Sequence, residues 1–120
     1  MGDRMGIISG NVGALSNATR AIFKVPTGYG GIRIIEAKYI DSGAGTSWLQ
    51  LADLGTAGTA AGTIIAAGGT VVNSANVPNA LALTAANCYV AEGHYVGVVE
   101  KNIGALGTVA IVDVAFLYGK

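Results

Sequence analysis

Apolar and polar side chains alternate along much of this chain, and the alternation predicts β-strands. In residues 19–25, Ala21 and Phe23 fall on one face of a strand, and Arg20 and Lys24 fall on the other. Side chains two positions apart share a face, so such a segment buries one face and exposes the other to water. Because no window carries a sustained apolar stripe with the period of a helix, the sequence predicts an all-β protein.

Two further segments show the same period over a greater length. In residues 32–40 the side chains expected to face inward are Ile35, Ala37 and Tyr39, with charged neighbours between them. Residues 108–118 are apolar at nearly every position, which is typical of a strand that is covered on both sides. We therefore expect both faces of this last strand to be buried.

Shorter apolar runs rich in β-branched residues complete the predicted set of strands. They are residues 48–54, 63–67, 70–72, 80–83, 88–91 and 95–100. Gly68 and Gly69 predict a tight turn between two of these strands, and residues 84–87 are also compatible with one helical turn. About seven to nine short strands separated by turns indicate an antiparallel β-sandwich, similar to a jelly roll.

The first 18 residues follow neither the strand period nor the helix period. Glycines alternate there with isolated large apolar residues, which predicts an extended arm that docks rather than a disordered end. Such an arm either adds an edge strand to a sheet or reaches across to a neighbouring molecule. We therefore divide the chain into an N-terminal arm, residues 1–18, and a single β-sandwich domain, residues 19–120.

Charge is scarce in this chain, and its scarcity excludes several classes of function. The 120 residues include 7 Lys and Arg against 7 Asp and Glu, so the formal net charge is zero. Nucleic-acid binding requires a basic surface, which this composition does not provide. One His and one Cys supply neither an intrachain disulfide nor the ligands of a Cys/His zinc site, and we expect no cofactor. Glycines interrupt the apolar runs too often for a membrane-spanning helix.

The sequence contains no recognisable catalytic motif. It has no Walker-type phosphate loop and no Gly-x-Ser-x-Gly nucleophile elbow. We interpret Cys88 as a small buried residue and His94 as a solvated turn residue, rather than as a nucleophile and its base. Asp53 and Asp113 lie inside predicted strands and are expected to face solvent or to pair with a cation. The candidate cations are Arg20, Arg33 and Lys38. We therefore expect a protein that is not an enzyme.

A stretch that is nearly free of charge carries the strongest functional signal. Residues 42–91 contain Asp53 as their only charged residue. A surface of small and hydroxyl side chains packs against another copy or another protein with little charge to desolvate. This is typical of a component of a larger shell or fibre. The candidate subunit-interface residues in this stretch are Ala60, Thr63 and Ile65.

Three segments give the chain a resemblance to a class of virion proteins. They are residues 21–28, a strand that runs into a Pro-x-Gly turn, residues 91–98, a turn that runs into a strand, and the last strand, residues 109–118. In these segments the chain resembles the small β-sandwich decoration (cement) proteins of tailed-bacteriophage capsids. The resemblance implies a homotrimer, made in the host cytoplasm, that sits on the lattice of the major capsid protein at the virion surface and stabilises the head.

The resemblance also implies a role for the N-terminal arm, which would reach onto the capsid or onto an adjacent trimer. The candidate capsid-binding residues of the arm are its large apolar ones, Met5, Ile7, Ile8, Val12 and Leu15. Neither nucleic acid nor a membrane is expected as a partner.

An alternative hypothesis is a glycan- or receptor-binding β-sandwich module of a virion head fibre or tail. Aromatic side chains combine a flat apolar ring with a polar group, which suits them to binding sugars. Trp48 follows a Gly-rich loop and is the candidate stacking residue.

Overall fold

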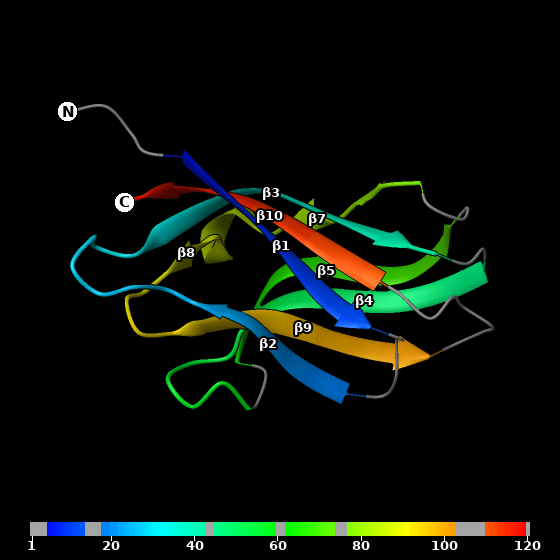
Figure 1. The fold of residues 1–120 in the computed structure, drawn as a ribbon, viewed down its shortest axis with the longest axis horizontal. Coiled ribbons are helices and arrows are strands. Elements are labelled where there is room, and N and C mark those ends of the chain that lie inside the picture. The colour runs from blue at the N-terminus through cyan, green and yellow to red at the C-terminus, as the bar shows by residue number, and fades with distance from the viewer. Residues whose placement is uncertain are drawn as a thin grey trace.

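Two antiparallel β-sheets packed against each other make up the described part of the chain (Figure 1). The computed structural model describes residues 5–13, 18–42, 45–59, 62–73, 77–102 and 110–119. The first sheet contains β1 (Met5–Gly13), β10 (Ala110–Tyr118), β3 (Ile32–Asp41), β6 (Asn79–Ala80) and β8 (Tyr89–Val90). The second contains β2 (Ala18–Lys24), β9 (Tyr95–Asn102), β4 (Gly45–Asp53), β5 (Thr63–Asn73) and β7 (Ala82–Leu83).

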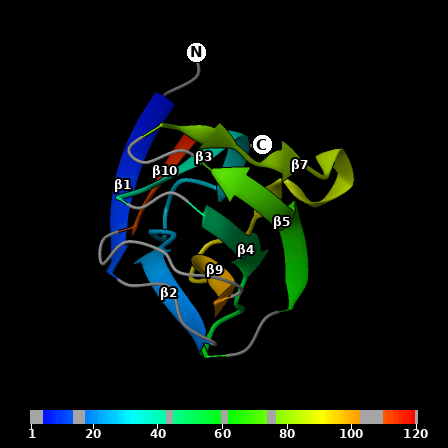
Figure 2. The same ribbon diagram turned by 90° about the vertical axis from the view of Figure 1, so that its right-hand side faces the viewer.

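Figure 2 shows the sandwich from one end. β1, β10 and β3 lie on one side of it, and β2, β9, β4 and β5 curve around the other. The strand pairs of both sheets are antiparallel. The predicted antiparallel β-sandwich is confirmed, and the helical turn allowed for residues 84–87 is present as a short 3-10 helix, η1 (Ala85–Asn87).

The hydrophobic core lies between the two sheets and consists mainly of branched aliphatic side chains. Its fully buried members include Ile32, Ile34, Tyr39, Val112 and Val114 from the first sheet and Leu49, Leu51, Ile65, Val96 and Val98 from the second. Burial of one such side chain stabilises a fold by about 1.5–3 kcal/mol. This layer therefore supplies the main stabilisation of the sandwich.

The alternation predicted for the last strand is confirmed, but only its inner face is covered. The alternate side chains Val112, Val114 and Phe116 of β10 are buried. On the other face, Ala115 and Leu117 are partly exposed. Because no further layer of the described chain covers that face, the expectation that both faces are buried is wrong for a single copy.

The predicted N-terminal arm contains β1, which is an edge strand of the first sheet. β1 pairs with β10 along its length, beginning with Met5 opposite Leu117. Gly6 faces inward, where a Cβ would lie 2.5 Å from the ring of Phe116, so the glycine lets the strand close over the core. Of the two alternatives for the arm, residues 5–13 take the edge strand. The predicted boundary after residue 18 therefore does not separate this segment from the sandwich.

A β-bulge in β5 replaces a predicted turn. β5 continues through Gly68 and Gly69, and these two residues lie opposite Leu49 alone in β4. Glycine inside a strand commonly marks a bulge because it tolerates the irregular backbone. The prediction of a tight turn at this point is therefore wrong, and one long strand replaces two short ones.

A second bulge changes which residues of β3 face the core. Ile34 and Glu36 pair with consecutive residues of β10, so Ile35 has no opposite residue. An extra residue shifts the alternation of a strand by one position. The expectation that Ile35 faces inward is consequently wrong, since its side chain is 42% exposed. Beyond the bulge, Ala37 and Tyr39 are buried as expected.

An ion pair between a partly exposed arginine and a buried glutamate joins two neighbouring strands of the second sheet. The side chain of Glu100 in β9 is fully buried, and Nε of Arg20 in β2 lies 3.2 Å from its Oε1. A bulge between Ala21 and Phe23 shifts the alternation of β2. As a result Ala21 is exposed and Arg20 faces Glu100, which reverses the faces predicted for these two residues.

Candidate interaction surfaces

The outer face of the first sheet carries exposed apolar side chains. Met5 and Ile7 of β1 are 63% and 67% exposed, and Ile35 of β3 is 42% exposed. Met5 lies opposite Leu117 of β10 and Ile7 lies opposite Ala115, next to the bulge at Ile35. We call these five residues the apolar outer face. Contiguous apolar surface of this kind marks contact sites on soluble proteins.

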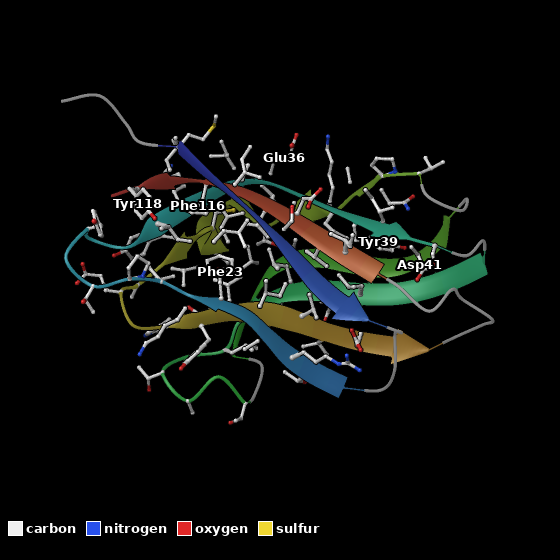
Figure 3. All side chains as sticks on the ribbon, viewed as in Figure 1. Phe23, Glu36, Tyr39, Asp41, Phe116 and Tyr118 are labelled. Carbon is white, nitrogen blue, oxygen red and sulfur yellow. The ribbon has the colours of Figure 1, made fainter. Side chains whose placement is uncertain are left out.

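Polar side chains border the apolar outer face. Glu36 and Lys38 of β3 form an exposed pair, with 3.7 Å between Lys38 Nζ and Glu36 Oε1, and Figure 3 shows Glu36 pointing away from the sandwich. Ser9 donates a hydrogen bond of 2.6 Å from its hydroxyl to Asp113 Oδ1 at the surface, so Asp113 faces solvent as expected. Because exposed ion pairs contribute only about 0–1 kcal/mol, the charges surround the apolar residues without fixing the fold.

The candidate capsid-binding residues divide between this surface and the core. Met5 and Ile7 belong to the apolar outer face, whereas Ile8 turns inward and packs against the core. Val12 lies in β1, but its side chain is outside the described residues, as is the whole of Leu15. Met5 and Ile7 are thus available to a partner, while Ile8 stabilises the sandwich itself.

The other candidate residues lie in different parts of the second sheet. Thr63 is exposed at the start of β5. Ile65 is 0% exposed within the single chain, so its assignment to a subunit interface is wrong: its side chain belongs to the core. Ala60 lies outside the described residues. Trp48 lies in β4 opposite Thr70 of β5, and its side chain is likewise outside the described residues.

Tyrosine side chains gather at the end of the sandwich where the loop after β2 leads into β3. The ring centroids of Tyr29 and Tyr118 lie 5.0 Å apart, and Tyr118 meets Phe116 edge to face at 5.3 Å. Figure 3 shows Tyr118 beside Phe116. The hydroxyl of Tyr89 donates a hydrogen bond of 2.8 Å to the carbonyl of Gly30. Tyr29 and Tyr89 are 50% and 40% exposed. We call Tyr29, Tyr89 and Tyr118 the tyrosine cluster.

The loop that carries Tyr29 is fastened by the carboxylate of Glu92. Glu92 Oε2 accepts hydrogen bonds from the backbone N–H groups of Gly30 at 2.7 Å and Gly28 at 2.6 Å. These bonds stabilise the charged form and lower the pKa of Glu92. Gly28 and Gly30 have φ angles of 98° and 77°, a conformation that favours glycine. Tyr29 of the tyrosine cluster therefore lies on a loop with a defined shape, while Tyr89 and Tyr118 belong to β8 and β10.

Comparison with known proteins supports the fold. No protein-family model matches the chain, and no curated protein matches it. Among solved structures, a chain of the cyanophage Pam1 capsid asymmetric unit is similar, with a TM-score of 0.55 and 18% sequence identity. The match covers 99% of this chain and 87% of that chain. At this identity the likeness shows that the two chains share a fold.

The side chains with reactive groups have partners in the described structure. His94 Nδ1 lies 3.0 Å from Asp53 Oδ1, which also accepts a hydrogen bond of 2.9 Å from the N–H of Gly55. Asp53 thus pairs with His94 rather than with one of the three predicted cations. Cys88 is buried, and its thiol donates a hydrogen bond of 3.3 Å to the carbonyl of Thr84. Burial raises the pKa of the Cys88 thiol, which lowers its reactivity.

The described residues contain neither a cluster of metal ligands nor a candidate membrane-spanning helix. In this part of the chain, no three His, Cys, Asp or Glu side chains come together as metal ligands would. No helix there has the length and apolar character needed to cross a membrane.

The strand period does not indicate the surface roles of Ile35 and Glu92. Adjacent apolar residues at Ile34 and Ile35 break the alternation, and this break is the local signal for the bulge. Glu92 lies 62 residues after Gly30 in the chain, so no local pattern connects it to the loop that it holds.

Proposed function

We propose that this protein is a structural component of a tailed-bacteriophage virion, a decoration protein that binds the lattice of the major capsid protein and stabilises the head. The proposal rests on the apolar outer face, presented by a β-sandwich whose fold is shared with a cyanophage capsid chain. The protein acts by binding at the capsid surface after synthesis in the host cytoplasm. The proposed role includes neither catalysis nor a cofactor.

Apolar contact supplies the driving force for this attachment. Burial of apolar surface contributes about 25 cal/mol per Å² removed from water. Met5, Ile7 and Ile35 each keep a large exposed fraction in the isolated chain, so a partner surface has apolar area to cover. A capsid presents the same site many times, and a homotrimer, the oligomer we propose, binds several sites at once. Modest contacts of one subunit then add up to stable attachment.

Substitution of Ile35 tests the attachment surface. Ile35→Asp places a charge on the apolar outer face but outside the core, so the domain is expected to fold. We expect its affinity for capsids of the phage that carries the protein to fall about tenfold or more in co-sedimentation. Val77→Asp is the matched control, because Val77 is 49% exposed and is not part of the face.

The same assay separates this surface from the charge-poor stretch. Thr63→Lys places a charge on the exposed start of β5, in the second sheet. If Thr63→Lys releases the protein from capsids while Ile35→Asp binds as the unmodified chain does, the apolar outer face is not the attachment surface. Sedimentation equilibrium of the same variants reports whether either change also alters the mass of the oligomer.

A glycan- or receptor-binding module of a head fibre or tail is the second candidate. The tyrosine cluster favours it, because Tyr29 is exposed on a loop of defined shape and Tyr89, exposed on β8, is hydrogen-bonded to that loop. Under this hypothesis Tyr29→Ala abolishes binding to bacterial surface saccharides on a glycan array, and Trp48→Ala tests the residue singled out by the sequence. An unmodified chain that binds capsids and leaves the array empty would favour the decoration protein.

A further inference from the structure

β1 is hydrogen-bonded to a neighbouring strand on one side only. Its partner is β10, and in the described residues no strand pairs with its other edge. The backbone N–H and C=O groups on that edge are therefore open to another strand. A free edge of this kind is a template for pairing with a second chain.

The usual protection of a free edge is missing over most of β1. Proteins commonly blunt such edges with lysine, proline, a bulge or a very short strand. β1 is nine residues long, contains neither a charged residue nor proline, and has its irregularity between Asn11 and Gly13, near its end. The stretch from Met5 to Gly10 is consequently a regular, uncharged edge.

The edge strand of the other sheet covers only part of β1. A Cβ at Gly10 would overlap the side chain of Ile22 in β2, so the two edges meet there. Toward Met5 the strands separate, as Figures 1 and 2 both show. The free length is the half of β1 that also carries the exposed Met5 and Ile7.

We propose that this edge pairs with β1 of a second copy of the chain, antiparallel and across a two-fold axis. Two identical antiparallel strands offer each other the same donors and acceptors, so the contact is self-complementary. The strand carries no charge, so the pairing brings no like charges together. The apolar outer faces of both copies then join into one surface, centred on Met5 and Ile7 of each.

The inference deepens the proposed self-association and requires no capsid. A two-fold contact closes with two copies, so it joins pairs of subunits or adjacent trimers and does not itself form a trimer. Loss of capsid binding in Ile35→Asp and loss of self-association through β1 are therefore separate results.

Cysteine cross-linking tests the pairing and its register. Met5→Cys, Ile7→Cys and Ser9→Cys are made in a Cys88→Ala background, and each variant is oxidised alone and in pairwise mixtures. In an antiparallel pair, the numbers of facing residues add up to a constant. A residue that lies two positions from the two-fold axis is about 14 Å from the same residue of the other copy. This distance is beyond the reach of a disulfide. We expect cross-linked dimers to form about tenfold faster for the combinations whose residue numbers share one sum than for the other combinations.

Ile7→Lys tests the same pairing without a cysteine substitution in β1. Ile7→Lys places a charge beside the edge on a side chain that points to solvent, and it is expected to raise the dissociation constant of the dimer about tenfold in sedimentation equilibrium. Val77→Lys serves as the control and retains the affinity. A monomeric unmodified chain at high concentration, or cross-links whose residue numbers share no sum, would overturn the proposal.

Discussion

At the scale of single residues, Glu92 stabilises a loop that is distant in the sequence by accepting its backbone hydrogen bonds. Its carboxylate replaces water as the acceptor for the N–H groups of Gly30 and Gly28, whose positive φ angles turn these groups toward one point. Each bond to a charged acceptor is stronger than a neutral one. One side chain therefore holds the position of Tyr29 and, with it, the shape of the tyrosine cluster.

Stability should depend on the charge of Glu92 in a defined pH range. Its pKa is lowered in the folded state, so its contribution is fully present above the ordinary value of 4.5 and is lost as the pH falls through the lowered folded-state pKa. We expect Glu92→Gln to lower the melting temperature at pH 7 and to match the unmodified chain once the pH is below both values.

Thermal unfolding monitored by circular dichroism at a series of pH values measures this difference. Glu36→Gln is the control, because Glu36 is an exposed carboxylate of β3 whose ion-pair partner is the exposed Lys38. A difference between the unmodified chain and Glu92→Gln that stays constant down to pH 2 would contradict the role of the charged carboxylate.

At the scale of elements, bulges decide which face of a strand a residue occupies. The extra residue in β3 moves Ile35 to the surface, and the one in β2 turns Arg20 toward Glu100. A strand has a period of two, so a single inserted residue exchanges the faces of everything beyond it. Both the apolar outer face and the ion pair of Arg20 with the buried Glu100 therefore depend on one-residue irregularities.

The ion pair between β2 and β9 gives a prediction at this scale. Arg20→Met removes the cation next to a fully buried carboxylate, and we expect it to destabilise the protein by about 3 kcal/mol. The double variant Arg20→Met with Glu100→Leu removes both charges and should recover most of that loss. Urea denaturation of the two variants measures the difference, and equal losses in both would show that the charge of Glu100 is not what Arg20 compensates.

At the scale of the whole molecule, the sandwich separates its core from its contacts. Both sheets turn their branched aliphatic residues inward, while the first sheet also keeps apolar residues on its outer face. Its order places β1 at an edge, so one end of this sheet offers an apolar face and a free backbone edge together. The capsid assay tests the apolar outer face, and the cross-linking assay tests the free edge of β1. The two proposals can therefore fail independently.

The sequence alone was sufficient for the fold class and for most strands. Period-two alternation indicates which segments are extended because it reflects the two faces of every strand, and it located β2, β3, β9 and β10 closely. It did not separate the predicted strand at residues 80–83 into β6 and β7, which pair in different sheets. That division depends on Leu81, which is buried and donates a backbone hydrogen bond to Ala37.

Local pattern thus determined that this chain is a charge-poor β-sandwich protein, because alternation and composition are properties of neighbouring residues. Tertiary structure decided which apolar residues remain exposed, since Ile35 and Ile65 look alike in the sequence but lie on the surface and in the core. It also decided the pairs Asp53 with His94 and Glu92 with Gly30, whose members are far apart in the chain. The physical reason is that packing between distant segments sets the strand register, the bulges and the sheet order. Residues that are far apart in the chain come together only through that packing.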